Sequence, residues 1–353
     1  MPSNAAPHAV TAPSTPVRIQ RPALPAAICS LAGVGFYLPQ NILTNEQLST
    51  TVDTSDAWIV ERTGIRGRHT ADATEATSDL AYRAGSAALT DAGLKPSDVD
   101  LILFATSTPD TPVPATACYL QARLGCGQVP AMDIGAGCSG FGTALHMAGA
   151  AVKSGMHKSV LVVGADCLTR ITNYTDRQSC ILFGDGAGAA VVTQRGFIDV
   201  VYSDIGADGT AADLIRVPAG GSREPASIAS VEGCKHTLEL RGREVFKAAV
   251  RQMCDCIRRA AAAIGVTTAD FDLIIPHQAN ARIIEAIGDQ LECPPSRLVI
   301  DIAETGNTAA ASIPVALGRA RHAGILKPGQ LVAVVGFGAG LAWACQVFLV
   351  KDR

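Results

Sequence analysis

Short apolar runs alternate with longer segments of helical periodicity along most of the chain. Apolar runs that read as buried strands occupy residues 101–105, 131–134, 160–165 and 273–276. Between two of these runs, the apolar positions share one helical face, namely Phe141, Leu145, Ala148 and Val152. A second strong helical pattern spans residues 240–264. This alternation is typical of an α/β protein with a largely buried sheet.

The order of these features repeats once along the chain. The matching stretches are residues 92–106 with 264–278, 154–164 with 323–336, and 183–192 with 337–345. A repeat of this length indicates two duplicated α/β halves rather than a solenoid of short units. We place the halves at residues 27–195 and 196–353, and we expect the polar stretch 207–233 to form a long loop.

The overall composition narrows the classes of function. The chain has 353 residues, of which 48% are hydrophobic and 17% charged, so it can bury a large ordered core. Its net charge of −3 supplies no overall positive field of the kind that nucleic acid or an acidic membrane surface attracts. No apolar run reaches the length of a membrane span. We therefore expect neither nucleic-acid binding nor membrane insertion.

The first residues and the cysteines bear on location and cofactors. Residues 1–26 are rich in Pro, Ala, Ser and Thr and lack the apolar segment of a secretion signal, so we expect a disordered tail. The 11 cysteines are irregularly spaced, and their one close pair, Cys254 and Cys256, fits neither a zinc nor a redox CxxC motif. We therefore expect reduced cysteines, no metal site and a cytoplasmic location.

One cysteine stands where a helix is predicted to begin. Cys138 lies on a turn rich in glycine (Gly135, Gly137 and Gly140), between the run 131–134 and the following helix. The unpaired N–H groups and positive dipole potential of a helix start favour a thiolate over a thiol. The glycines let a large acyl substrate approach the backbone. Cys138 is therefore a candidate nucleophile, with a small buried apolar residue as the alternative interpretation.

The same turn also fits a weaker pattern. Residues 135–140 spell GxGxxG between a strand and a helix, and the next apolar run ends at an acid, Asp166. That arrangement is found in dinucleotide-binding proteins. However, the motif lies far from the first predicted strand, and a reactive thiol has no function in a pyrophosphate cradle. An NAD-dependent oxidoreductase is therefore the less favoured hypothesis, from a different class of function.

Three further features accompany Cys138. His277 ends the apolar run 273–276, at the edge where α/β proteins place reactive groups. Asn307 follows a glycine at a loop-to-helix junction, and the glycine loop 336–340 can lend a backbone N–H to an oxyanion. Taken singly, His277 and Asn307 also fit a structural histidine and a helix cap.

Taken together, these motifs resemble the β-ketoacyl-acyl-carrier-protein synthase III branch of the thiolase superfamily. The resemblance covers about residues 27–353 and rests on GAGCSGF, PHQANARI, GNTAAAS, WIVERTGI and FGDGAGAA. It implies a five-layered α/β/α/β/α fold of two duplicated halves and a homodimer. It also implies decarboxylative condensation of an acyl-CoA primer with malonyl-acyl-carrier protein, which initiates fatty acid synthesis, without a metal or redox cofactor.

The resemblance assigns roles at the reaction centre. Cys138 would be the acylated nucleophile, and His277 and Asn307 would be the pair that promotes decarboxylation. The backbone N–H groups of Cys138 and Ala339 would hold the oxyanion, although the family pattern has glycine where this chain has Ala339. Phe337 would be the gate beside the thiol.

Substrate-binding positions carry over in the same way. Trp58, Arg62 and Arg177 would hold coenzyme A, because an aromatic ring and guanidinium planes suit its adenine end. Arg282 and Lys247 would dock the acidic carrier protein.

The identity of the acyl primer stays open. Arg243 occupies a position where some relatives have an asparagine facing the pantetheine, and Val113 lies near a residue that relatives donate across a dimer. A ketosynthase or acyltransferase of secondary metabolism, using an aromatic or longer acyl group, is the alternative within the same family.

Overall fold

The computed structural model describes residues 23–352. Its central feature is a sheet of nine strands in the order β11-β12-β13-β8-β1-β7-β6-β4-β5. These strands are β1 (Cys29–Tyr37), β4 (Leu101–Ala105), β5 (Ala131–Ile134), β6 (Val160–Cys167), β7 (Asp185–Thr193), β8 (Ile198–Ala207), β11 (Leu273–Pro276), β12 (Leu331–Gly338) and β13 (Ala342–Val350). Two small ribbons pair β2 (Asn41–Thr44) with β3 (Gly67–Thr70) and β9 (Ile215–Arg216) with β10 (Glu239–Leu240).

The helices lie between and outside the strands. They are α1 (Asn45–Leu48), α2 (Asp56–Thr63), α3 (Thr77–Ala92), α4 (Thr116–Leu124), α5 (Gly140–Lys153), α6 (Ile228–Glu232), α7 (Gly242–Ala263), α8 (Ala281–Gln290), α9 (Ile302–Thr305) and α10 (Ser312–His322). The helix predicted at residues 240–264 is confirmed as α7. In α5, the four predicted core positions Phe141, Leu145, Ala148 and Val152 are all buried.

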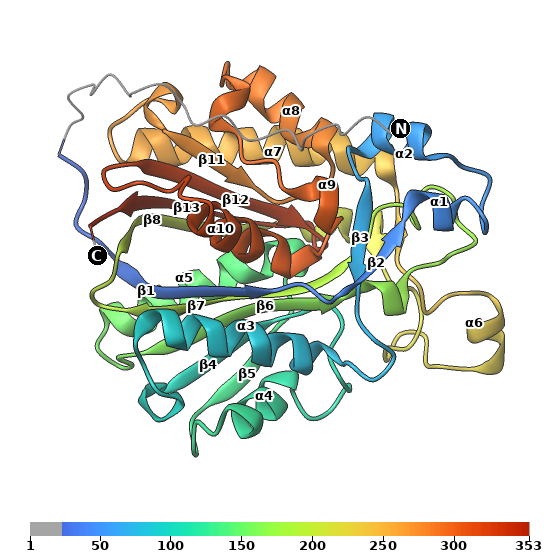
Figure 1. Cartoon of the computed structure of the whole chain (residues 1–353), viewed down its shortest axis with the longest axis horizontal. Helices are drawn as coiled ribbons and strands as arrows, with labels where there is room; N and C mark the ends of the chain where they lie inside the picture. Colours follow the sequence, from blue (N-terminus) through green and yellow to red (C-terminus); the bar gives the residue numbers. More distant parts are fainter. Residues whose placement is uncertain (1–22, 353) are drawn as a thin grey trace, which may run out of the picture.

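The elements form five layers (Figure 1). Helices α7 and α8 cover one side of the strands β11, β12, β13 and β8, and helices α3 and α4 cover the far side of β1, β7, β6, β4 and β5. Helices α5 and α10 lie between the two groups of strands and contact both. The groups join where Cys29–Leu31 of β1 pairs with Ile198–Val200 of β8. The predicted five-layered α/β fold is thereby confirmed.

Apolar burial explains why the layers stack. Side chains of α5 and α10, including Phe141, Leu145, Ile313 and Leu317, pack between the two groups of strands in one core cluster. Separate clusters fill the spaces beneath α7 and beneath α3. Each amphipathic helix removes its apolar face from water against a sheet that is itself apolar on both faces.

The two groups of strands are built alike. In each group the first strand in sequence pairs with the last, β1 with β7 and β8 with β13. The predicted boundary at residues 195–196 falls in the turn between Thr193 and Ile198. The division into two duplicated halves stays a prediction, and this strand order supports it.

Three local expectations need correction. The strand at 131–134 is not fully buried, because β5 lies at the end of the sheet and Met132 is 41% exposed. The expected loop 207–233 contains β9 and the short helix α6, which projects from the body in Figure 1. The expected tail, residues 1–26, lies outside the described residues up to residue 22, while Leu24 packs against the cluster beneath α7.

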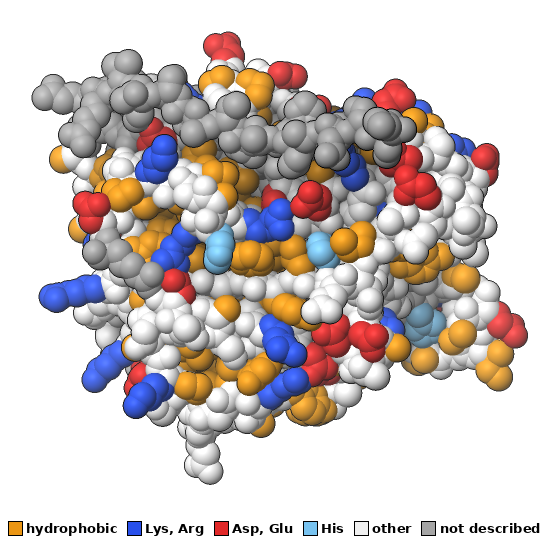
Figure 2. Space-filling model, viewed as in Figure 1, with side chains coloured by type: hydrophobic (Ala, Val, Ile, Leu, Met, Phe, Trp, Pro, Cys, Tyr) orange, Lys and Arg blue, Asp and Glu red, His pale blue; other side chains and the backbone are white. Residues whose placement is uncertain are grey.

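Surface charge and helix length agree with the composition. Acidic and basic side chains are interspersed over the described part of the face seen in Figure 2. Between residues 23 and 352, no helix combines the length and apolar character that crossing a bilayer requires. The same residues contain no cluster of three or more His, Cys, Asp or Glu side chains that would hold a metal ion.

Candidate active site

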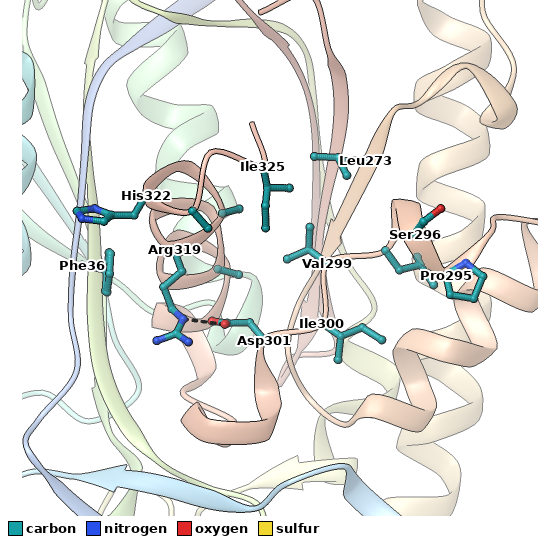
Figure 3. A pocket seen from close by; sticks show the side chains of 14 residues that line it. Phe36, Leu273, Pro295, Ser296, Val299, Ile300, Asp301, Arg319, His322 and Ile325 are labelled. Atoms are coloured by element: carbon teal, nitrogen blue, oxygen red, sulfur yellow. Dashed lines mark hydrogen bonds and ion pairs between the residues drawn. The ribbon is translucent and has the colours of Figure 1, made fainter. Parts of the chain in front are cut away.

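Two hollows of the molecule are candidate sites. One, shown in Figure 3, has a volume of about 750 Å³ and is walled mainly by apolar side chains such as Phe36, Val299 and Ile325. Its charged groups include Arg319 from α10 and Asp301, whose Nε and Oδ1 atoms lie 2.7 Å apart. None of the predicted catalytic or substrate-binding residues lines it.

The second hollow collects the residues predicted to act together. It has a volume of about 280 Å³, and its lining includes Cys138, His277, Asn307, Phe337 and Ala339. These residues come from four separate stretches of the chain and meet where β5, β11 and β12 end. The structure therefore brings the predicted reaction centre together in one pocket.

Cys138 is seated on a tight turn beside the glycine loop. It lies in the 3-10 turn η2 (Gly137–Ser139), which leads directly into α5. A Cβ atom added to Gly338 would lie only 2.7 Å from both the N and Cβ atoms of Cys138. A Cβ atom on Gly137 would lie 3.0 Å from the N atom of Ala339. These close approaches pack the backbone around Cys138 directly against the backbone around Ala339.

The same contacts weigh against a dinucleotide cradle. Two glycines of the GxGxxG pattern face other parts of the protein, because Gly137 packs against Ala339 and Gly140 packs against Ala105. This packing buries Gly140, while Gly137 is half-buried and lines the pocket beside Cys138. The glycines serve the packing of the cysteine turn.

Burial changes the acidity of the candidate nucleophile. Removal from water raises the pKa of the Cys138 thiol to about 12, the charge of Asp166 adds to the rise, and a backbone N–H lowers it in part. The expectation that the helix start yields a thiolate is therefore wrong for the free protein. The cost of burying the charged form exceeds the stabilisation by the backbone. Cys138 is a thiol at neutral pH.

His277 is oriented by a serine that sequence reasoning did not single out. Its Nδ1 atom lies 2.5 Å from Oγ of Ser312, at the start of α10. The N–H of Gln278 donates to the same Oγ at 3.4 Å, and the hydroxyl hydrogen is free to point at Nδ1. A hydroxyl that donates to Nδ1 requires the tautomer with the ring hydrogen on Nε2. Burial lowers the pKa of His277 to about 3, so the ring is neutral.

Asn307 is held through both its backbone and its side chain. Its N–H donates to the carbonyl of Leu182 at 2.8 Å, and its carbonyl accepts from Gly184 at 3.0 Å. Its side-chain Oδ1 accepts from the N–H of Ala309 at 2.9 Å. The side-chain NH₂ is therefore the group that Asn307 can offer to a ligand. Because Ala309 begins the 3-10 helix Ala309–Ala311, this oxygen contact also has the form of a helix cap.

The rest of the pocket is apolar. Leu168, Phe183 and Ala309 form a small buried cluster, and Cys138 and Leu238 pack against it. Phe337 lies on the opposite group of strands, at the end of β12, and is itself buried. An uncharged acyl group bound to the sulfur would meet hydrocarbon on these sides.

A groove, distinct from the two hollows, leads toward this pocket from the surface. It has a volume of about 720 Å³, and its lining includes Trp58, Arg62, Arg177, Arg243, Lys247 and Arg282. The groove and the pocket share Leu182, Leu240, Gly242, Phe246 and Asn280 as lining residues. The predicted coenzyme A and carrier-protein residues therefore surround the approach to Cys138.

Trp58 is stacked with two of these arginines. The guanidinium carbon of Arg177 lies 4.2 Å from the centre of the Trp58 ring system, and that of Arg62 lies 4.9 Å from it. Both arrangements are cation–π contacts. Arg177 lies too close to Trp58 for another aromatic ring to fit between them.

Two polar residues near the centre were not assigned a role in the reaction from the sequence. Ser312 is the last residue of the quoted motif GNTAAAS, and Asp166 ends the predicted strand at 160–165. Their neighbours are distant in sequence, since Ser312 contacts His277 and Asp166 contacts Ala310. Two features of the sequence could have drawn attention to them. Ser312 is a hydroxyl residue at the start of a helix, and Asp166 is an acidic residue at the end of an apolar strand.

Comparison with protein families gives two matches. Residues 132–209 match the family described as 3-oxoacyl-[acyl-carrier-protein (ACP)] synthase III, and residues 261–350 match its C-terminal part. The first match includes Cys138, and the second includes His277 and Asn307.

Individual proteins agree over nearly the whole chain. The chain is 49% identical over 319 residues to a β-ketoacyl-[acyl-carrier-protein] synthase III of Caldanaerobacter subterraneus subsp. tengcongensis, covering 90% of this chain and 96% of that protein. The crystal structure of 3-oxoacyl-[acyl-carrier-protein] synthase III from Aquifex aeolicus superposes with a TM-score of 0.84 at 41% identity, covering 91% of this chain and 99% of that one. The priming β-ketosynthase of the R1128 polyketide pathway has the same TM-score, 0.84, at 33% identity, covering 95% and 99%.

Proposed function

The chain belongs to the 3-oxoacyl-[acyl-carrier-protein] synthase III family, and we propose that Cys138, His277 and Asn307 carry its reaction. The enzyme condenses an acyl primer with malonyl-acyl-carrier protein, the step that initiates fatty acid synthesis. The convergence of these three residues in one pocket, beside the backbone N–H groups of Cys138 and Ala339, is the observation that carries the assignment of roles.

Acyl transfer is the first step. The sulfur of Cys138 attacks the carbonyl carbon of the acyl thioester, and the N–H groups of Cys138 and Ala339 stabilise the negative oxygen that forms. The carbon–sulfur bond to the leaving group then breaks. Since Cys138 starts as a thiol, its proton passes to the departing thiolate, and the acyl group remains on Cys138. The apolar cluster around Leu168 and Phe183 receives the acyl chain.

Decarboxylation and condensation follow. Nε2–H of His277 and the NH₂ of Asn307 donate to the carbonyl oxygen of the malonyl thioester. Carbon dioxide leaves, and the electron pair of the broken carbon–carbon bond becomes an enolate that these donors stabilise. The enolate carbon attacks the acyl carbon on Cys138. The Cys138 thiolate is expelled, takes up a proton, and the β-ketoacyl thioester is released.

A neutral His277 suits this step. A donor with a pKa near 3 keeps the same protonation state throughout the physiological range. The required tautomer has its hydrogen on Nε2, and the Ser312 hydroxyl lies 2.5 Å from Nδ1, where it can donate to the unprotonated nitrogen. Ser312 is therefore a positioning residue for the pair that promotes decarboxylation.

The groove around Trp58 is proposed to bind acyl-CoA and the carrier protein. Arg62 and Arg177 supply positive charge beside an aromatic ring, which suits a nucleotide with phosphates. For the adenine to stack between Trp58 and Arg177, the Arg177 side chain must move from its present contact. The exposed side chains of Lys247 and Arg282, on α7 and α8, are proposed to dock the acidic carrier protein.

The proposed homodimer is supported by the open edge of the sheet. Within the described residues, β5 pairs on one side only, and Met132 on it is 41% exposed. Val113, which lies near the residue that relatives donate across a dimer, is 84% exposed. A cytoplasmic location and the absence of a metal or redox cofactor stay predictions.

The direct test of this function is product formation. Purified protein mixed with a panel of acyl-CoA thioesters and malonyl-acyl-carrier protein should release carbon dioxide and convert the carrier protein to its β-ketoacyl form, read by intact mass. The member of the panel that reacts fastest identifies the primer. A thermal shift with NAD but none with acyl-CoA would contradict the proposal, because a ligand stabilises only a protein that binds it.

Replacing Arg62 by alanine tests the binding groove. We expect the KM for acyl-CoA to rise roughly 10-fold with little change in kcat, because the lost contact is made equally in the ground and transition states. The KM for malonyl-acyl-carrier protein should change less. Arg83→Ala is a matched control, since Arg83 also stacks on an aromatic ring, that of Tyr37, away from this groove. Equal damage toward both substrates would assign Arg62 a structural role.

A further inference from the structure

Asp166, at the end of β6, is a fully buried carboxylate beneath the reaction centre. It has no exposed surface, and each of its five hydrogen-bonding contacts donates to it. Its Oδ1 accepts from Thr106 Oγ1 at 3.1 Å, from Ser107 N at 2.6 Å, and from Thr108 N and Oγ1 at 3.2 and 3.1 Å. Three of the five donors are backbone N–H groups, which cannot accept a hydrogen. Burial raises the pKa of Asp166 to about 6, and its hydrogen-bond donors oppose that rise, so the side chain is a carboxylate at neutral pH.

The remaining oxygen of Asp166 holds the turn that carries Asn307. Oδ2 accepts from the N–H of Ala310 at 3.0 Å. The preceding residue, Ala309, has a φ of 44°, a left-handed conformation that an alanine adopts only when its surroundings impose it. The N–H of Ala309 in turn holds Oδ1 of Asn307. Asp166 and Asn307 thus restrain consecutive N–H groups of one strained turn.

Ala310 also packs closely against two glycines, one on β6 and one at the start of α5. A Cβ atom on Gly164, two residues before Asp166 on β6, would lie 2.3 Å from the carbonyl oxygen of Ala310. A Cβ atom on Gly140, next to the cysteine turn, would lie 3.7 Å from the Cβ of Ala310. The turn therefore rests on β6 at Gly164 and Asp166, and it contacts the start of the helix that follows Cys138.

We propose that Asp166 is a positioning residue that fixes the Asn307 turn against the Ser107 wall of the pocket, and so sets the donor geometry for decarboxylation. Ser107 lines the same pocket as Asn307, and Asp166 is hydrogen-bonded to the backbone of both walls. This inference rests on the proposed function. Asp166 touches no substrate and acts through Asn307.

The carboxylate has a second, measurable effect on the centre. Its negative charge contributes to the raised pKa of the Cys138 thiol. Loss of that charge should lower the thiol pKa. A loosening of the fold that admits water to Cys138 would lower it as well, so the comparison requires a variant of another buried carboxylate.

Asp166→Asn is the test. The amide keeps the shape but presents one NH₂ group, which must face either Ala310 or the Ser107 and Thr108 donors. Because the second arrangement breaks more contacts, we expect the NH₂ to face the Ala310 N–H and displace the turn. Single-turnover carbon dioxide release from malonyl-acyl-carrier protein, measured on pre-acylated protein, should fall at least 30-fold. Acylation of Cys138, followed by intact mass, should stay within about threefold of the wild type.

Asp185→Asn is the matched control. Asp185 is equally buried at the start of β7 and also accepts backbone and hydroxyl donors, from Ala71 and Thr169. Alkylation of Cys138 by iodoacetamide should reach a given rate at lower pH in Asp166→Asn than in the wild type or in Asp185→Asn. Equal decarboxylation in Asp166→Asn and wild type, or parallel losses of acylation and decarboxylation, would overturn the inference.

A milder variant covers the case in which Asp166→Asn does not fold. Thr106→Val removes one donor to the carboxylate and leaves its charge in place. Decarboxylation should then fall threefold to tenfold with unchanged acylation, and a parallel loss of both would again overturn the inference. A wild-type protein that accepts no acyl group and releases no carbon dioxide would instead refute the proposed function, so the two failures are distinct.

Discussion

Replacing Cys138 by alanine is expected to abolish the acyl adduct and condensation. Wild-type protein exposed to acyl-CoA should gain one acyl mass, located on the peptide that contains Cys138, and the variant should gain none. Condensation should fall on the order of 10⁴-fold or more, since the covalent intermediate cannot form. Intact-mass measurement and peptide mapping read the adduct directly, and release of the β-ketoacyl product reads the turnover.

The other cysteines supply the control for this experiment. Among the described residues, Cys118 and Cys234 are exposed free thiols, and most of the others are buried. Cys118→Ala should retain both the adduct and the turnover, because Cys118 lies outside the pocket. An adduct of undiminished intensity in Cys138→Ala would place the nucleophile elsewhere. The backbone oxyanion site would then lack the acyl group that it is proposed to stabilise.

His277→Ala and Asn307→Ala are expected to separate the two halves of the reaction. Each variant should still transfer an acyl group to Cys138. Neither should release carbon dioxide from malonyl-acyl-carrier protein at more than about one hundredth to one thousandth of the wild-type rate, the usual cost of removing one oxyanion donor. The physical reason is that both donors address the enolate oxygen, which exists only after the malonyl group begins to lose carbon dioxide.

His146 offers a matched histidine control. Its Nδ1 lies 3.0 Å from Oγ of Ser203, a pairing like that of His277 with Ser312, but it lines a different hollow. His146→Ala should leave carbon dioxide release unchanged. Normal condensation by Asn307→Ala would reduce Asn307 to a structural residue of its turn. The enzyme would then be better described as an acyltransferase without decarboxylation.

Much of the fold could be predicted because its determinants are local. The helical spacing of Phe141, Leu145, Ala148 and Val152 identified α5, since a helix exposes one face to the core wherever it packs. Apolar runs likewise identified β4 and β6. Periodicity says less about the position of a strand in its sheet. The run 131–134 was apolar enough for a central strand, yet β5 lies at the sheet edge with Met132 exposed.

The grouping of site residues was also accessible from the sequence, through motifs. Cys138, His277 and Asn307 lie in three motifs whose order and amino-acid sequences resemble one family, and the structure places them in one pocket. What the motifs did not reveal is how each side chain is held. Ser312 contacts His277, which is 35 positions away in sequence, and Asp166 contacts Ala310, which is 144 positions away. No local sequence pattern marks such pairs.

The sequence by itself determined the apolar runs of β4, β6 and β11, the helices α5 and α7, the glycine turn around Cys138 and the chemical identity of the reacting groups. These depend on neighbours within a few residues and on side-chain type. Only the tertiary structure decided the state of those groups. It made Cys138 a thiol, His277 a neutral donor and Arg177 a partner of Trp58. The reason is that acidity and hydrogen-bonding direction depend on burial and on charges that reach the site from distant parts of the chain.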